Sequence, residues 1–142
     1  MLDPEKMALQ GSEHAIQVAV FMYFAVPSIK EAYPDTEWLF AIPNGGERSK
    51  VSAAALKAEG VKSGVHDICL PVARRGYFGM FLEMKNAKGK PSDKQLQFAR
   101  FASGNGYFVW IIDKPTPLEC YNEAINAIRW YLDGEKTQVI KN

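Results

Sequence analysis

The sequence predicts an α/β domain in which a mixed β-sheet is flanked by helices. Segments with a helical spacing of apolar residues alternate with short runs rich in Phe, Ile, Leu and Val, and Pro and Gly residues separate them. A hydrophobic content of 47% over 142 residues suits one domain with a sizeable core. We therefore expect residues 1–142 to form a single domain whose strands lie between helices.

The first half of the chain predicts a helix, a strand and a second helix. Ser12 begins the first helix, which breaks at Pro27. Its apolar face comprises Ile16, Val20, Tyr23 and Phe24. A strand over 37–42 and a helix over about 50–59 follow, and Gly60 caps that helix.

The centre of the chain predicts a β-hairpin. Strands are expected over 67–72 and 77–84, joined by a three-residue loop, 74–76, that places a glycine at its left-handed position. This register sets Asp67 directly opposite Glu83, with Cβ atoms roughly 5 Å apart. The hairpin therefore brings two carboxylates together on adjacent strands.

The last third predicts a helix, a strand and a final helix. A helix is expected over 92–104 and a strand over 107–112. The final helix covers about 116–133, with Pro117 in its first turn. Together with the hairpin, this order gives a mixed sheet with helices on its faces.

Asp67, Glu83 and Lys85 form a candidate catalytic group. Side chains alternate along a strand, so Glu83 and Lys85 project from one face. Two carboxylates as close as Asp67 and Glu83 repel each other unless a cation compensates them. Magnesium suits such a pair because it binds through one or two carboxylates and keeps waters. With a lysine to orient or deprotonate a water, this group predicts metal-assisted hydrolysis of a phosphodiester.

The same residues also have structural explanations. Glu83 and Lys85 would otherwise form a solvated ion pair worth under about 1 kcal/mol. Glu13 follows a candidate N-cap, Ser12, and shares a helical face with Gln17. It therefore either interacts with the helix dipole or adds a carboxylate to the site.

Gln95 likewise has two interpretations. Ser92 and Gln95 have the spacing of a capping box, in which the glutamine side chain returns to the backbone of the serine. A helix start also favours phosphate binding through its free N–H groups. The two interpretations agree on position but require different side-chain directions.

Five motifs in order resemble the VRR-NUC domains, a branch of the PD-(D/E)XK nuclease superfamily found in phage, bacterial and eukaryotic repair proteins. The motifs are Ser12-Glu13 with Gln17, residues 43–48, residues 60–67, Glu83-Met84-Lys85, and residues 92–95. They span about residues 12–112. The resemblance implies a restriction-endonuclease-like fold and a DNA endonuclease that depends on Mg²⁺ or Mn²⁺.

The resemblance also implies a role for each site residue. Asp67 and Glu83 would be metal ligands, Lys85 the catalytic lysine, and Glu13 and Gln95 would complete the catalytic site. Compact members of the family resemble junction-resolving enzymes, which implies a homodimer acting on branched DNA such as a four-way (Holliday) junction. The alternatives are a non-catalytic DNA-binding module and a sequence-specific restriction-type endonuclease.

The net charge of +1 hides an uneven distribution. Residues 44–94 carry ten Lys or Arg against five Asp or Glu, whereas residues 1–43 carry two against six. A local basic surface can attract a polyanion even on a nearly neutral protein. The expected DNA contacts are Asn44, Arg48, Lys50, Lys88, Lys90 and Lys94. Ordinary solvated charge is the alternative for these residues.

The remaining distinctive residues are interpreted as structural. The tryptophans Trp38, Trp110 and Trp130 are expected in the core. His66 is not expected to bind a metal, because a histidine site needs more histidines and only His14 remains. Cys69 and Cys120 lack metal-site spacing and are expected as reduced thiols.

Two expectations concern the protein's surroundings. With neither a long apolar segment nor a signal peptide evident, we expect a cytoplasmic protein of a bacterial or phage-infected cell. The candidate dimer interface is a stripe on the final helix, and packing of this stripe onto the chain's own sheet is the alternative. The stripe comprises Tyr121, Ile125, Ile128 and Leu132.

Overall fold

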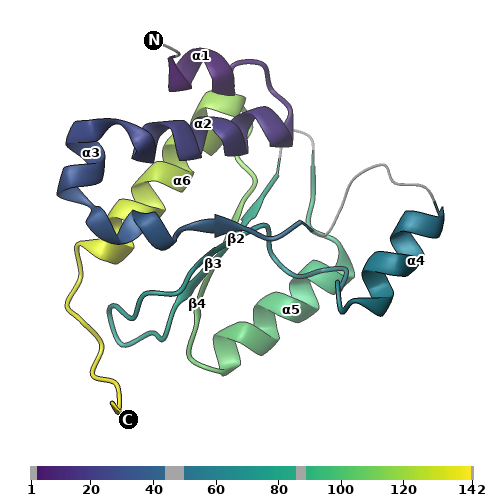
Figure 1. Ribbon diagram of the computed structural model, residues 1–142. Helices are drawn as coiled ribbons and strands as arrows, with labels where there is room; N and C mark the ends of the chain where they lie inside the picture. Colours follow the sequence, from purple (N-terminus) through teal and green to yellow (C-terminus); the bar gives the residue numbers. More distant parts are fainter. Residues whose placement is uncertain (1–2, 44–49, 86–88, 142) are drawn as a thin grey trace.

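The computed structural model describes residues 3–43, 50–85 and 89–141 and contains a four-stranded mixed sheet flanked by helices (Figure 1). The strands are β1 (Phe40–Ala41), β2 (Ile68–Leu70), β3 (Met80–Met84) and β4 (Phe108–Ile112). The helices are α1 (Pro4–Ala8), α2 (Glu13–Ala25), α3 (Pro27–Ala32), the 3₁₀ helix η1 (Pro34–Trp38), α4 (Lys50–Ala58), α5 (Asp93–Gly104) and α6 (Pro117–Leu132). The predicted α/β fold class is confirmed.

The sheet has the order β1-β2-β3-β4, with β4 at one edge. β1 and β3 both pair with β2 in an antiparallel arrangement, whereas β3 and β4 are parallel and are connected through α5. In the hairpin, Ile68 lies opposite Leu82 and Leu70 opposite Met80, as the sequence predicts. Continuing this register by one residue sets Asp67 opposite Glu83.

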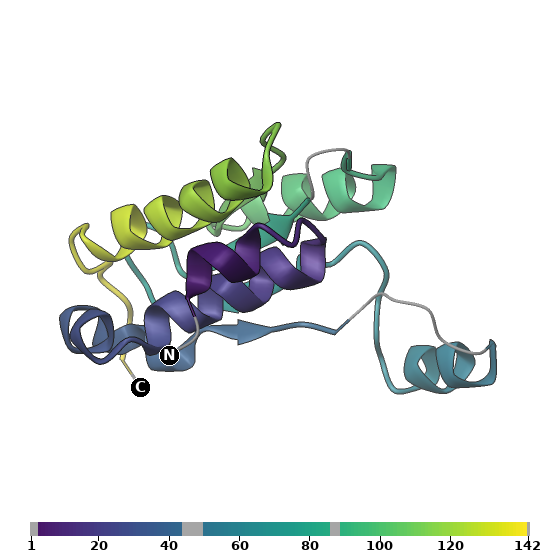
Figure 2. The same ribbon diagram turned by 90° about the horizontal axis from the view of Figure 1, so that it is seen from above.

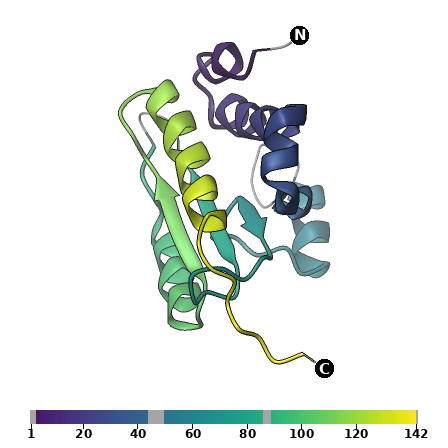
Figure 3. The ribbon, with the colours of Figure 1, turned by 90° about the vertical axis from the view of Figure 1, so that its left-hand side faces the viewer.

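Different helices cover the two faces of the sheet (Figure 3). α2 and α6 bury Ile16, Val20 and Ile128 in one core with alternate β3 residues, among them Leu82. On the opposite face, Phe98 of α5 packs edge-on against Phe81, with ring centroids 5.1 Å apart. Because residues of a strand alternate between faces, Glu83 also belongs to the α5 face. The α4 helix extends away from these layers (Figure 2).

The largest departure from the predicted elements lies before the sheet. The expected strand over 37–42 shortens to β1, because Pro34 begins the 3₁₀ helix η1 and Thr36 Oγ1 donates to the carbonyl of Tyr33 at 2.7 Å. The predicted break at Pro27 is confirmed, yet this proline also occupies the first turn of α3. The sequence analysis missed α1 and α3.

The hairpin turn is tighter than predicted. Arg74 pairs with Tyr77, so only two residues form the loop. Gly76 has the expected positive φ of 85°, but Arg75 also adopts a left-handed conformation with a φ of 55°. The Arg75 guanidinium lies 3.9 Å from the Trp130 ring centroid, and its Nε donates to the Trp130 carbonyl at 2.8 Å. These contacts offset the strain that a side chain meets in this conformation.

Two predictions about apolar residues are wrong. Trp38, Trp110 and Trp130 are 63%, 43% and 45% exposed, because they lie on η1, the edge strand β4 and the outer side of α6 rather than in the core. The α6 stripe is internal instead of forming an interface. Its members Tyr121, Ile125 and Ile128 are buried, and Leu132 packs against the same core. Within the described ranges, no helix is long and apolar enough to cross a membrane.

Candidate functional site

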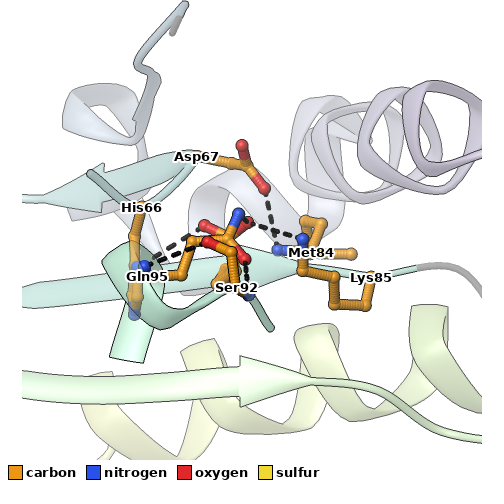
Figure 4. Close-up of polar contacts among 7 residues, drawn as sticks. His66, Asp67, Met84, Lys85, Ser92 and Gln95 are labelled. Atoms are coloured by element: carbon orange, nitrogen blue, oxygen red, sulfur yellow. Dashed lines mark hydrogen bonds and ion pairs between the residues drawn. The ribbon is translucent and has the colours of Figure 1, made fainter. Parts of the chain in front are cut away.

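The predicted catalytic group assembles where β2 begins and β3 ends (Figure 4). Asp67 directly precedes β2, and its Oδ2 accepts a hydrogen bond of 2.9 Å from the backbone N–H of Met84. This bond ties the aspartate side chain to the neighbouring strand. Lys85 directly follows β3, where its backbone N–H donates to the Ile112 carbonyl at 2.8 Å. Hydrogen bonds with the backbone of the sheet therefore hold both Asp67 and Lys85 in place.

Glu83 lies at the centre of the group and is only 1% exposed. Its Oε1 accepts a hydrogen bond of 2.6 Å from Gln95 Nε2 and lies 3.4 Å from the Lys85 ammonium. Glu83 and Lys85 thus share one face, as the alternation along the strand predicts. The ion pair is buried rather than solvated, which removes the surface salt bridge as an explanation.

Gln95 forms the predicted capping box and also contacts Glu83 of the candidate site. Its Oε1 accepts from the Ser92 backbone N–H at 2.9 Å, and Ser92 Oγ accepts from the Gln95 N–H at 3.2 Å, which completes a capping box. The other end of the amide donates to Glu83. The prediction that the two roles require different side-chain directions is wrong, because an amide carries an acceptor and a donor on opposite sides.

Glu13 also combines its two interpretations. It lies in the first turn of α2, after Ser12, whose Oγ accepts from the Ala15 N–H at 3.0 Å. The half-buried Glu13 carboxylate is close enough to Asp67 that its charge raises the pKa of that aspartate. The N-terminal turn of α2 thereby adds a third carboxylate near the hairpin.

The two carboxyl groups at the centre of the site, Asp67 and Glu83, both have raised pKa values. Burial and then the charge of Asp67 raise the pKa of Glu83 to about 8, and Lys85 only partly opposes this. Burial also raises the pKa of Asp67, with a further contribution from Glu13, while the Met84 N–H lowers it. Such shifts arise when like charges share a poorly hydrated site and lack a cation.

The carboxylates fit a hard divalent cation that keeps waters. Within the described residues, no three His, Cys, Asp or Glu side chains are already arranged as a metal cluster. Mg²⁺ does not need one, because one or two carboxylates with several waters suffice. Glu83 Oε2 is buried without a hydrogen-bond partner among the described residues, so this oxygen could act as a metal ligand. The repulsion between Asp67 and Glu83 would be relieved by such an ion.

His66 is a site residue that the sequence analysis missed. Its fully buried ring packs against Phe98 with centroids 4.9 Å apart, and its Nδ1 lies 3.4 Å from Glu83 Oε2. Burial and the nearby Lys85 lower the pKa of His66 to about 4, against an opposing effect from the Gly64 backbone. Its position next to Asp67 is the signal that the sequence offers for this placement.

The expected DNA contacts are only partly described. Lys90 is exposed, and the exposed Lys94 donates to Ser63 Oγ at 3.1 Å from the first turn of α5. Gly64 allows the two backbone segments to lie this close, since a Cβ at residue 64 would be 2.8 Å from the Lys94 backbone. Lys50 begins α4, but its side chain is outside the described part of the structure. Asn44, Arg48 and Lys88 lie outside the described residues altogether.

Comparison with solved structures finds a close match in fold. A structure described as "VRR_NUC domain protein" superposes with a TM-score of 0.70 at 20% sequence identity, covering 92% of this chain and 96% of that one. No protein-family model matches the chain. No curated protein matches it either. The chain therefore has the fold of that VRR_NUC domain protein over nearly its whole length, a restriction-endonuclease-like mixed sheet flanked by helices.

Proposed function

We propose that this protein is a nuclease of the VRR-NUC type, a DNA endonuclease that depends on Mg²⁺ or Mn²⁺. The observation that carries the proposal is the environment of Glu83. Its carboxylate is buried beside Asp67, contacted by Lys85 and held by Gln95, and its pKa is raised to about 8. A strained carboxylate pair with a neighbouring lysine at a strand end is a typical arrangement for cation-assisted hydrolysis.

Each residue of the group has a distinct proposed role. Asp67 and Glu83 would hold the cation, and Gln95 would hold Glu83 in place through its 2.6 Å hydrogen bond. A bound divalent ion would polarise the phosphoryl oxygen and favour formation of hydroxide. Lys85 would orient the attacking water and stabilise negative charge on the phosphate, and Glu13 would contribute through a water or directly.

The proposed substrate is branched DNA, and the proposed active form is a homodimer. The residues that the structure describes carry a single candidate site, while paired cuts in two strands require two sites related by a twofold axis. Lys90 and Lys94 lie on the segment that leads from β3 into α5, next to Gln95. Exposed ammonium groups at the start of a helix suit contacts to a DNA backbone.

A cleavage panel tests this proposal. Plasmid, linear duplex, flap, fork and four-way junction are incubated with the protein in Mg²⁺, Mn²⁺, Ca²⁺ or EDTA. We expect cleavage in Mg²⁺ and Mn²⁺, none in EDTA, and DNA binding with little turnover in Ca²⁺, because the looser coordination of Ca²⁺ positions the water poorly. Undiminished cleavage in EDTA would remove the metal from the proposal.

The panel and a mass measurement separate the finer parts of the proposal. Light scattering at micromolar concentration should give the mass of a dimer, and the junction should be cut faster than linear duplex. A monomer that cuts both equally well would leave a general nuclease. Binding without cleavage in every metal would instead support the non-catalytic module.

A further inference from the structure

The Glu83 carboxylate is contacted differently at its two oxygens. Oε1 meets Gln95 Nε2 at 2.6 Å and the Lys85 ammonium at 3.4 Å. Oε2 faces the His66 ring, with Nδ1 at 3.4 Å. Each carboxylate oxygen can accept two hydrogen bonds or metal contacts, so Oε2, which has one such neighbour, retains capacity for a cation.

An apolar side chain at the position of the His66 imidazole would give a more stable folded state. The ring is fully buried, and among the described residues neither nitrogen has a partner at full hydrogen-bond geometry, although the Gly64 backbone lies near enough to oppose the lowering of the His66 pKa. A buried polar group without a well-formed hydrogen bond destabilises the folded state. Phe98 packs edge-on against one side of the ring and is itself in contact with Phe81. The aromatic layer beneath α5 therefore fixes where the imidazole points.

The only charged group that the buried imidazole approaches at ion-pair distance within the described residues is Glu83. The gap of 3.4 Å exceeds a firm hydrogen bond by a few tenths of an ångström. A small rotation of a carboxylate engaging a cation would close it. The contact thus offers a second point of support, opposite Gln95, for a side chain whose orientation determines whether Asp67 and Glu83 can act together.

We propose that His66 is a positioning residue, whose Nδ1–H holds Glu83 Oε2 so that the carboxylate keeps the orientation needed to bind a divalent cation. This inference rests on the proposed metal-dependent function. Hydrogen-bond partners of metal ligands commonly set ligand orientation, and their loss typically weakens metal binding 10–100-fold. His66 itself binds no metal in this proposal and contacts only the ligand.

Direct binding of Mn²⁺ to the DNA-free protein tests the inference, measured by calorimetry and by loss of the free-ion electron paramagnetic resonance signal. His66→Leu keeps much of the apolar volume and removes the nitrogen, and we expect it to bind Mn²⁺ about 10–100-fold more weakly. His66→Asn places an amide nitrogen near the former Nδ1, and we expect affinity within about threefold of the parent protein. Circular dichroism confirms that each variant is folded.

Phe81→Leu is the matched control, because Phe81 contacts Phe98 and Tyr107 in the same aromatic layer but does not pack on the His66 ring. We expect Mn²⁺ affinity within about threefold of the parent protein. If His66→Leu does not fold, His66→Gln replaces it, since its longer side chain carries the amide past Nδ1 and should not rescue binding as asparagine does.

The outcomes separate this inference from the proposed function. Parent-like affinity in folded His66→Leu, or an equal loss in Phe81→Leu, overturns the positioning role while leaving the metal site intact. A parent protein that binds no Mn²⁺ contradicts the proposed metal-dependent function and the inference together. Weak binding in His66→Leu with rescue by His66→Asn supports both.

Discussion

The two faces of the sheet are built from alternate residues of the same strand, yet they differ in chemistry. Toward α2 and α6, β3 contributes Met80, Leu82 and Met84 to an apolar core. Toward α5, the chain places two buried titratable side chains, Glu83 and Lys85. The first face stabilises the fold through apolar burial. The second face is destabilised by carboxylates whose repulsion a cation would relieve, and this difference separates the scaffold from the site.

Replacing the lysine tests the α5 face most strongly. We expect Lys85→Ala to lower the cleavage rate about 10²–10⁴-fold, because the charge and the oriented water would both be lost. The free energy of unfolding should change much less than the activity does. Single-turnover cleavage and urea unfolding measure the two quantities. The exposed Lys6 of α1 provides the control, and Lys6→Ala should retain nearly full turnover. Parent-like cleavage by Lys85→Ala would remove Lys85 from the mechanism.

Truncating the opposite face should reverse this pattern. Leu82 is buried, so Leu82→Ala is expected to lower the free energy of unfolding by about 2–5 kcal/mol. Cleavage per folded molecule should remain close to that of the parent protein, because the side chain points away from Glu83. The half-exposed Val139 provides a control, and Val139→Ala should cost less than about 0.5 kcal/mol. Equal losses of activity in Leu82→Ala and Lys85→Ala would show that the two faces do not act separately.

The stability of the metal-free protein should fall as the pH rises from 6.5 to 8. The pKa of Glu83 is about 8 in the folded protein against an ordinary 4.5, so the folded state holds a proton that the unfolded chain releases. This contribution is complete below about pH 4.5 and is lost as the pH rises through 8. The lowered pKa of His66, about 4, acts in the opposite sense only below its ordinary value of 6.5.

Chemical denaturation across this window, in EDTA, measures the effect. The slope attributable to Glu83 should not exceed about 1.4 kcal/mol per pH unit. Glu83→Gln should flatten the curve, because its amide does not titrate. A curve of unchanged slope in Glu83→Gln would show that another group is responsible.

The smallest expected effect is a gain in stability. Asp67→Asn removes one of the repelling charges while its side-chain oxygen can still accept the hydrogen bond from the Met84 N–H. We expect the metal-free variant to gain about 1 kcal/mol in free energy of unfolding and to lose cleavage. Thermal unfolding in EDTA and in Mg²⁺ gives the comparison, and stabilisation by Mg²⁺ should disappear in the variant. A destabilised Asp67→Asn in EDTA would argue against repulsion at the site.

Local signals in the sequence were sufficient to predict much of the fold. They were also sufficient to predict the placement of Asp67, Glu83 and Lys85. The alternation around Glu83 and the turn at Gly76 predicted the hairpin register, which the structure confirms from Ile68 to Leu70. The capping spacing of Ser92 and Gln95 likewise predicted the start of α5. These features depend on residues close together in the chain, where strand periodicity and turn chemistry determine the outcome.

The features that the sequence analysis missed depend on tertiary context. Trp110 is a large aromatic residue in an apolar strand, which predicts a core position, but that strand lies at the sheet edge. The contacts of His66 arise only when α5 brings Phe98 onto its ring and the hairpin brings Glu83 to its nitrogen. The double use of Gln95 required knowing both where Glu83 lies and that the amide could bridge two groups. None of these relations has a fixed sequence spacing.

Anomalous scattering from crystals of the protein soaked in Mn²⁺ tests the central claim most directly, namely that the α5 face of the sheet holds a divalent cation between Asp67 and Glu83. The account predicts one strong anomalous peak in contact with both carboxylates, and loss of that peak in crystals of Asp67→Asn. A protein that cleaves DNA in Mn²⁺ while its crystals show the ion elsewhere, with none at these two carboxylates, would contradict it.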